Sequence, residues 1–234
     1  AALQLDLARA LPEAAGRRDA LLRGELLIPI VKGWCTEYAI ELASLGLQVH
    51  GGMGYIEETG IAQTWRDARI TTIYEGTTGI QANDLPGRKL GRDDGAAMRV
   101  LLEEADRELE GYRADADTTA LPAVLAAARE GLSQLRAATA ALLPQLQGSP
   151  AAAHAVGVPY LKLAGVVLGG WLMARAAHIA AQRLAAGATD QAALRAKLQS
   201  ARCYAAQIMP QALAGSRVVR TGGASIAAAE MDLL

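Results

Sequence analysis

Glu75 is the side chain in this sequence with the best setting for acid–base chemistry. It stands in the run Tyr74-Glu75-Gly76-Thr77-Thr78, at a connector between two segments with helical patterning. A carboxylate there could take a proton from a substrate, and an apolar pocket makes such a group a stronger base than it is in water. The alternative is structural, because helix dipoles favour Glu near helix N-termini and hydroxyls there cap the helix. These residues alone leave both interpretations open.

A glycine cluster precedes Glu75 in the run His50-Gly51-Gly52-Met53-Gly54. Small residues after a helix let a phosphate or pyrophosphate approach exposed backbone N–H groups. The structural alternative is a glycine cap at the end of a helix followed by a turn, and this is the commoner use of such a cluster. Taken alone, the glycine cluster is weak support for a ligand site.

Both motifs depend on the helices that flank them. From Leu27 to Val49 the apolar residues recur three and four positions apart, which predicts a long helix with one face against a core. The glycine cluster should end this helix. A short helix is expected over residues 59–67 and another over 77–90, which completes a first helical domain at residues 1–91.

A polar break at Arg92-Asp93-Asp94-Gly95 separates this domain from further helical segments. Apolar stripes then recur over four segments, at residues 98–112, 121–142, 159–186 and 190–209. Their short connections predict an antiparallel four-helix domain at residues 92–215. Residues 216–234 lack a strong period and are expected to form a tail or docking segment. The predicted fold class is all-α, with two successive helical bundles.

Composition supports this fold class and argues against several functions. Ala and Leu dominate and Phe is absent, which favours helix over sheet. Lys and Arg total 23 against 24 for Asp and Glu, so no overall field draws the chain to nucleic acid. The apolar window at residues 156–179 contains Lys162, Arg175 and His178, so we expect a buried helix rather than a membrane span.

Cysteine and histidine residues give no sign of a metal site or a disulfide. Cys35 and Cys203 lie far apart in apolar, helix-like surroundings, which predicts reduced, buried thiols and a cytoplasmic location. His154 and His178 have no Cys, Asp or Glu at ligand spacing on the same helical face. No metal is therefore expected.

Three motifs in fixed order favour the catalytic interpretation of Glu75. They are Leu47-Gln48-Val49-His50-Gly51-Gly52-Met53-Gly54-Tyr55, Trp65-Arg66-Asp67-Ala68-Arg69-Ile70 and Ile73-Tyr74-Glu75-Gly76-Thr77-Thr78-Gly79-Ile80-Gln81. Their order and spacing closely resemble the C-terminal signature of acyl-CoA dehydrogenases, and the resemblance covers residues 1–90. The continuation at residues 84–90 is similar to the subgroup with an extra C-terminal helical domain, which includes methylthiopropionyl-CoA dehydrogenases.

The resemblance implies the last helical domain of a three-domain flavoenzyme of fatty acid metabolism, with FAD as its cofactor. Glu75 matches the glutamate that removes the α-proton of an acyl-CoA while the β-hydrogen leaves as hydride to the flavin. An electron-transfer flavoprotein would be the partner, although an oxidase variant stays open, and the protein would be a homo-oligomer, a dimer or tetramer. The first residues have the pattern of the middle of a helix, so we expect the chain to be a fragment of such an enzyme and to be inactive alone.

The same resemblance implies two sets of contacts to FAD. The contacts to the adenosine diphosphate part, held mainly by a neighbouring subunit, would come from Gln48, Gly51 and Gly52, with Gly54 shaping the loop. Thr77 would meet the FAD of its own subunit. Gly79 stands where many relatives carry a polar side chain, so a contact there would use the backbone or Thr78.

Two other functional hypotheses compete with the hypothesis of an acyl-CoA dehydrogenase. A non-catalytic helical oligomerisation or interaction module could retain the signature without using it. A DNA-associated relative of the same flavoprotein superfamily would need a basic groove, which the near-neutral net charge disfavours.

Overall fold

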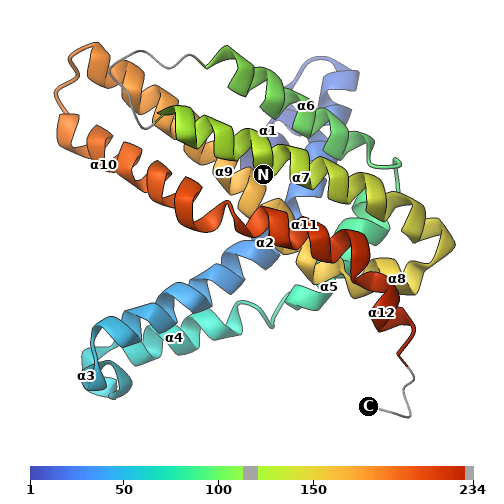
Figure 1. Cartoon of the computed structure of the whole chain (residues 1–234), viewed down its shortest axis with the longest axis horizontal. Helices are drawn as coiled ribbons and strands as arrows, with labels where there is room; N and C mark the ends of the chain where they lie inside the picture. Colours follow the sequence, from blue (N-terminus) through green and yellow to red (C-terminus); the bar gives the residue numbers. More distant parts are fainter. Residues whose placement is uncertain (113–120, 230–234) are drawn as a thin grey trace.

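The protein is helical throughout the part of the chain that its structure describes (Figure 1). The structure is a computed structural model that describes residues 1–112 and 121–229. Within those two ranges every regular element is a helix and no strand occurs. The predicted all-α fold class is therefore confirmed.

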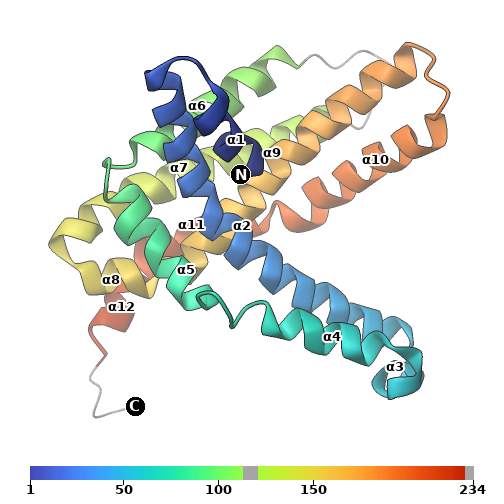
Figure 2. The same ribbon diagram turned by 180° about the vertical axis from the view of Figure 1, so that it is seen from behind.

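The first part of the chain contributes helices to a helical body and also forms an arm, made of the second half of α2 with α3, η1 and α4, that projects from this body (Figures 1 and 2). Its elements are α1 (Ala2–Ala10), α2 (Ala14–Val49), α3 (Gly52–Tyr55), the 3-10 turn η1 (Glu57–Thr59), α4 (Ile61–Ile70), α5 (Thr78–Asp84) and the π-helical turn η2 (Leu85–Leu90). Helix α2 starts in the body and reaches the tip of the arm, where α3 reverses the chain, and α4 returns beside α2 (Figures 1 and 2). Pro29 lies inside α2 without ending it.

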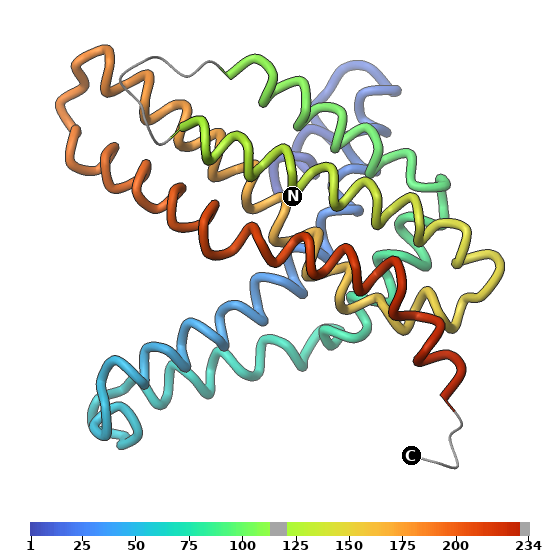
Figure 3. The backbone as a smooth tube through the Cα atoms, in the orientation of Figure 1, coloured from blue at the N-terminus to red at the C-terminus, as the bar shows by residue number. Residues whose placement is uncertain are grey.

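The second part of the chain forms the rest of the body. Its elements are α6 (Ala96–Gly111), α7 (Leu121–Gly148), α8 (Pro150–Ala155), α9 (Gly157–Ala185), α10 (Gln191–Cys203), the π-helical turn η3 (Tyr204–Ile208), α11 (Gln211–Thr221) and α12 (Gly223–Ala227). Successive long helices run antiparallel to each other, and α10, η3 and α11 follow one another without a break along the direction opposite to α9 (Figure 3). Helix α9 packs against α2, α7, α10 and α11 and so lies at the centre.

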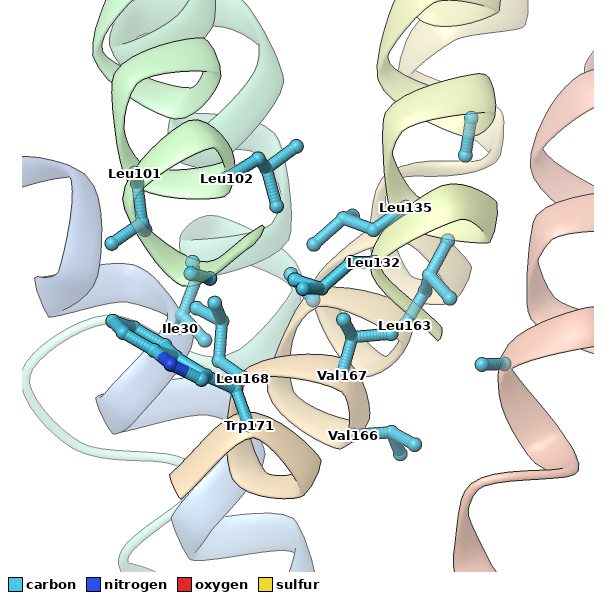
Figure 4. Packing of buried hydrophobic residues seen from close by; sticks show 14 of the residues in the cluster. Ile30, Leu101, Leu102, Leu132, Leu135, Leu163, Val166, Val167, Leu168 and Trp171 are labelled. Atoms are coloured by element: carbon cyan, nitrogen blue, oxygen red, sulfur yellow. The ribbon is translucent and has the colours of Figure 1, made fainter. Parts of the chain in front are cut away.

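One continuous core joins the two parts of the chain. Ile30 of α2 lies in the same buried cluster as Leu102 of α6, Leu132 of α7 and Leu168 of α9 (Figure 4). Leu90 of η2 belongs to this cluster as well. The core thus runs across the predicted domain boundary at residue 91, and the division into two domains stays a prediction.

The apolar stripe of α2 does not lie against a core along its whole length. Its members Val31, Leu42 and Val49 are 46%, 63% and 87% exposed, whereas a neighbouring face of α2 buries Leu26 and Ile30. The reason is that α4 covers a different face of α2, where Ala43 is buried. Periodicity identifies an apolar face correctly but not the surface that covers it.

The C-terminal segment and the cysteines also differ from expectation. The expected tail at residues 216–234 begins inside α11, which continues to Thr221 and buries Ser216 and Val219 against α7 and α9. The helical periodicity of this segment is hard to recognise in the sequence, because Ala and Gly contrast too little with their neighbours to mark an apolar face. Cys35 and Cys203 are free thiols, as predicted, but both are exposed rather than buried.

Helix α9 is long and apolar enough to cross a membrane by length and composition, although 61% of its most apolar window is buried inside the protein. That burial is what a core helix requires. Its Arg175 donates two hydrogen bonds of 2.5 Å to the Glu108 carboxylate of α6, and Trp171 Nε1 donates a third of 2.8 Å. Burial raises the pKa of Glu108, but hydrogen bonds from Arg175 and Tyr112 outweigh it and leave that pKa below its ordinary value.

Candidate functional site

Glu75 lies in a loop at residues 71–77 that connects α4 to α5, where the arm joins the body (Figure 1). The loop is a series of turns. The N–H of Ile73 donates to the carbonyl of Ile70 at 3.0 Å, and the N–H of Thr78 closes the loop by donating to the carbonyl of Thr72 at 3.1 Å. Glu75 is exposed at the outside of this loop.

The backbone at Glu75 is in a left-handed conformation. Its φ is +54°, and the next residue, Gly76, has a φ of +90°. A residue with a Cβ in that region costs about 1–2 kcal/mol relative to the right-handed conformation. Glycine suits position 76 because of this φ; a Cβ there would lie 2.9 Å from Nε2 of Gln81, the end of a flexible side chain that can move aside. Such backbone is retained only where its surroundings hold it, and it clusters at functional sites.

Thr77, and not Glu75, caps the following helix. The Thr77 hydroxyl accepts a hydrogen bond of 3.3 Å from the N–H of Ile80. Among the described residues, the Glu75 carboxylate has no hydrogen-bond or ion-pair partner. The structural alternative for this motif therefore accounts for Thr77 but leaves Glu75 without a capping role.

Two side chains of α2, distant in sequence, brace the Glu75 loop. Lys32 Nζ donates a hydrogen bond of 2.5 Å to the carbonyl oxygen of Gly76. Glu37 Oε1 accepts one of 2.6 Å from the Thr78 hydroxyl. Sequence reasoning missed both residues, because their partners lie 44 and 41 positions away and no local motif marks them.

The glycine cluster lies at the other end of α4, at the tip of the arm (Figure 2). Gly51 has a φ of +61°, which turns the chain from α2 into α3. A Cβ at Gly51 or Gly52 would meet no atom of the described residues within 4 Å, so this part of the chain leaves the space beside them open. Gly54 is different, because a Cβ there would lie 2.3 Å from the Leu47 carbonyl oxygen. Gly54 is thus required for α3 to pack closely on α2.

The predicted site residues form two groups, which lie apart from each other within one chain. Gln48 is exposed on the last turn of α2, next to Gly51 and Gly52. Glu75 and Thr77 lie beyond the far end of α4, whose 10 residues span roughly 15 Å at 1.5 Å per residue. Gly79 belongs to the second group, and a Cβ there would lie at an ordinary 3.7 Å from Thr77 Oγ1, so nothing in the fold requires glycine.

The charged residues between the two groups brace turns. Arg66 of α4 makes a two-pronged ion pair with Glu57 of η1, at 2.8 and 2.7 Å. The hydrogen bond from Arg66 holds the pKa of the Glu57 carboxyl below its ordinary value. Arg69 donates to the Thr72 hydroxyl at the start of the Glu75 loop. Pairs this exposed contribute little to stability, so their main effect is on local geometry.

Comparison with known protein families matches both parts of the chain. Residues 2–90 match the model described as "Acyl-CoA dehydrogenase, C-terminal domain". Residues 101–230 match the model described as "Acetyl-CoA dehydrogenase C-terminal like". Between the two matches lie only residues 91–100, which follow η2 and include the first residues of α6.

Individual relatives agree with the family models. The chain is 44% identical over 96% of its length to 3-methylmercaptopropionyl-CoA dehydrogenase of Ruegeria pomeroyi, and it covers 38% of that protein. It is 31% identical over 84% of its length to the broad-specificity linear acyl-CoA dehydrogenase FadE5 of Mycobacterium tuberculosis, and it covers 33% of that protein. The chain thus spans well under half the length of these relatives. With both family models matched in sequence order and a relative similar along almost the whole chain, this chain belongs to the acyl-CoA dehydrogenase family and corresponds to its C-terminal helical region.

Proposed function

We propose that this chain is the C-terminal part of an enzyme that performs FAD-dependent α,β-dehydrogenation of an acyl-CoA thioester, with Glu75 as the base. The observation that carries the proposal is the state of Glu75 itself. Its carboxylate is exposed and has no partner among the described residues, and its backbone is held in a left-handed loop at the position that the family signature predicts. Because the carboxylate has no partner, it can accept a proton from a substrate.

The role of Glu75 follows from the chemistry of the α-carbon. An α-proton becomes acidic when the thioester carbonyl is polarised, and a base must then lie within hydrogen-bond reach of it. FAD, when bound, supplies the acceptor for the hydrogen that leaves the β-carbon. The chain's own task is to hold the Glu75 carboxylate at a fixed place beside the α-carbon, because misplacement of a reacting group by 1 Å is costly in rate.

The glycine cluster at the tip of the arm fits the phosphate part of FAD. The space beside Gly51 and Gly52 is open, and Gly52 is the first residue of α3, whose N–H has no partner within the helix. Gln48 adds an exposed amide one turn away. Since the cluster is separated from Glu75 by α4, we propose that these residues hold the FAD of a neighbouring subunit, while Thr77, and Gly79 through its backbone, meet the FAD of their own.

A homo-oligomer is part of this proposal. The arm carries large apolar side chains that are exposed in a single chain, among them Leu42, Leu45, Val49 and Tyr55. Leu42, Leu45 and Val49 recur three and four residues apart on one face of α2, and exposed apolar surface of this kind marks interaction sites. A second copy that covers the arm would bring one chain's glycine cluster to the other chain's flavin. We propose an electron-transfer flavoprotein as the electron acceptor, because a dehydrogenase passes its electrons to a separate carrier.

The test uses the full-length enzyme, purified with its flavin. We expect a flavin absorption spectrum that bleaches when an acyl-CoA is added without oxygen, and we expect the 234-residue chain alone to catalyse no such reaction. A non-catalytic interaction module would show neither flavin absorbance nor bleaching. Absence of both in the full-length protein would therefore favour that alternative.

A further inference from the structure

Helix α2 holds the Glu75 loop at two points, both of which closely follow Glu75 in the chain. Lys32 Nζ bonds to the carbonyl of Gly76, directly after Glu75, and Glu37 bonds to the hydroxyl of Thr78, the first residue of α5. Lys32 and Glu37 lie five positions apart on one continuous helix, so the two anchor points are about 7.5 Å apart along its axis. One rigid element therefore fixes both the loop and the start of the helix that follows it.

Both anchors are hydrogen bonds to charged groups, and both are partly buried. Hydrogen bonds in which one partner is ionised are roughly twice as strong as neutral ones, and partial burial reduces competition from water. A surface lysine ordinarily points into solvent or pairs with a carboxylate. In the described part of the chain Lys32 has no ion-pair partner, so its charge is directed at the Gly76 carbonyl alone.

The loop needs such support. Two consecutive left-handed residues, Glu75 and Gly76, form its tip. Inside the loop, the hydrogen bond between the Thr78 N–H and the Thr72 carbonyl closes the ends but does not fix the tip. We expect loss of the Lys32 hydrogen bond to let the Gly76 peptide, and the Glu75 side chain with it, change orientation more easily.

We propose that Lys32 and Glu37 are positioning residues, which hold the Glu75 carboxylate in the orientation needed to take the substrate's α-proton. The proposal rests on the proposed function of Glu75. Neither residue touches the reacting atoms. Lys32 acts through the Gly76 carbonyl, and Glu37 acts through Thr78.

The test compares Lys32→Met in the full-length, flavin-loaded enzyme with Lys162→Met as a matched control. Lys162 is an exposed lysine of α9 with no hydrogen bond or ion pair among the described residues. We expect Lys32→Met to slow flavin reduction by acyl-CoA about 10- to 100-fold, the range for loss of one charge-assisted hydrogen bond. Flavin content and the Kd for acyl-CoA should stay within about twofold of wild type, since the binding surface is unchanged. Lys32→Arg, which keeps a cationic donor, should restore most of the rate.

A second readout does not depend on activity. In the flavin-free protein, amide hydrogen exchange at Thr78 should be about tenfold faster in Lys32→Met than in Lys162→Met, because the loop opens more often. Glu37→Met should have the same two effects, with Glu41→Met, one turn further along α2, as its control. If Lys32→Met does not fold, Glu37→Met tests the same proposal from the other anchor.

The outcomes separate this proposal from the function on which it rests. Slower reduction with unchanged acyl-CoA binding and faster exchange at Thr78 would support positioning by α2. Wild-type reduction by Lys32→Met and Glu37→Met, together with an inactive Glu75→Gln, would overturn the positioning role and leave the proposed function intact. A rate loss that only follows loss of bound flavin, with unchanged exchange at Thr78, would also overturn it. Wild-type reduction by Glu75→Gln would instead overturn the proposed function.

Discussion

Gly165→Ala should destabilise the protein, although alanine is the better helix former. Gly165 lies in α9 where Trp34 of α2 crosses it, and a Cβ there would be 2.1 Å from Trp34 Cγ and 2.5 Å from its Cδ1. Ordinary van der Waals contact begins at 3.4 Å, so the ring would have to move by about 1.3 Å. Trp34 lies between Lys32 and Glu37 in sequence, so this contact also fixes the segment of α2 that braces the Glu75 loop.

The size of the effect follows from two opposing contributions. Replacement of glycine by alanine inside a helix stabilises it by about 1 kcal/mol. Overpacking of a tight core costs about 1–3 kcal/mol, and a rigid indole ring between two long helices places this site at the upper end. The expected result is a net loss of about 1–2 kcal/mol in the free energy of unfolding.

The measurement is urea unfolding of the 234-residue chain, followed by circular dichroism. Gly111→Ala is the matched control, because a Cβ at the end of α6 would meet none of the described residues within 4 Å. That variant should be as stable as wild type or slightly more so. A Trp34→Leu change should cost less in the Gly165→Ala background than in wild type, since it removes the clash. If Gly165→Ala is as stable as Gly111→Ala, α2 and α9 are not in tight contact and the reasoning fails.

Three further substitutions test other contacts. Tyr160→Phe should cost about 1 kcal/mol of stability in denaturant unfolding, because the buried Tyr160 hydroxyl shares a 2.8 Å hydrogen bond with Thr139; no change would mean that this bond does not contribute. Glu108→Gln should cost about 1–2 kcal/mol at neutral pH after allowance for solvent exposure, since it weakens the pairing with Arg175. The pKa of Glu108 lies below its ordinary 4.5. The stabilisation of the fold by the ionised carboxylate is therefore fully present above pH 4.5 and is lost as the pH falls through the folded-state pKa. Tm measured against pH should fall in acid for the wild type, and fall less for Glu108→Gln. Gly54→Ala should disorder the tip of the arm and lower flavin content in the full-length enzyme, because its Cβ would lie 2.3 Å from a carbonyl oxygen of α2; normal flavin content would count against a role for the tip.

Helices and the two candidate motifs could be predicted from the sequence because their signals are local. Apolar residues at helical spacing identified the long helices, and the glycine cluster identified the end of α2 at Val49. Glu75 was placed correctly at a connector, since turns and caps depend on a few neighbouring residues.

Non-local features could not be predicted in this way. Lys32 and Glu37 look like ordinary charges on a helix, and only the folded chain brings them to Gly76 and Thr78. The exposed stripe of the arm was expected to face a core, because an apolar face looks the same in sequence whether its own chain or another covers it. Helix α11 was not predicted for a different reason, which is that its small residues carry little periodic signal.

Glu75→Gln in the full-length, flavin-loaded enzyme is the most direct test of the central claim, that Glu75 is the base. The substitution keeps the size and shape of the side chain but removes the proton acceptor. Anaerobic mixing with acyl-CoA, followed at the flavin absorption band, should be slower than in wild type by about 10²- to 10⁴-fold, the usual contribution of a general base. Acyl-CoA binding and flavin content should be unchanged. Flavin reduction at the wild-type rate in Glu75→Gln would contradict the account.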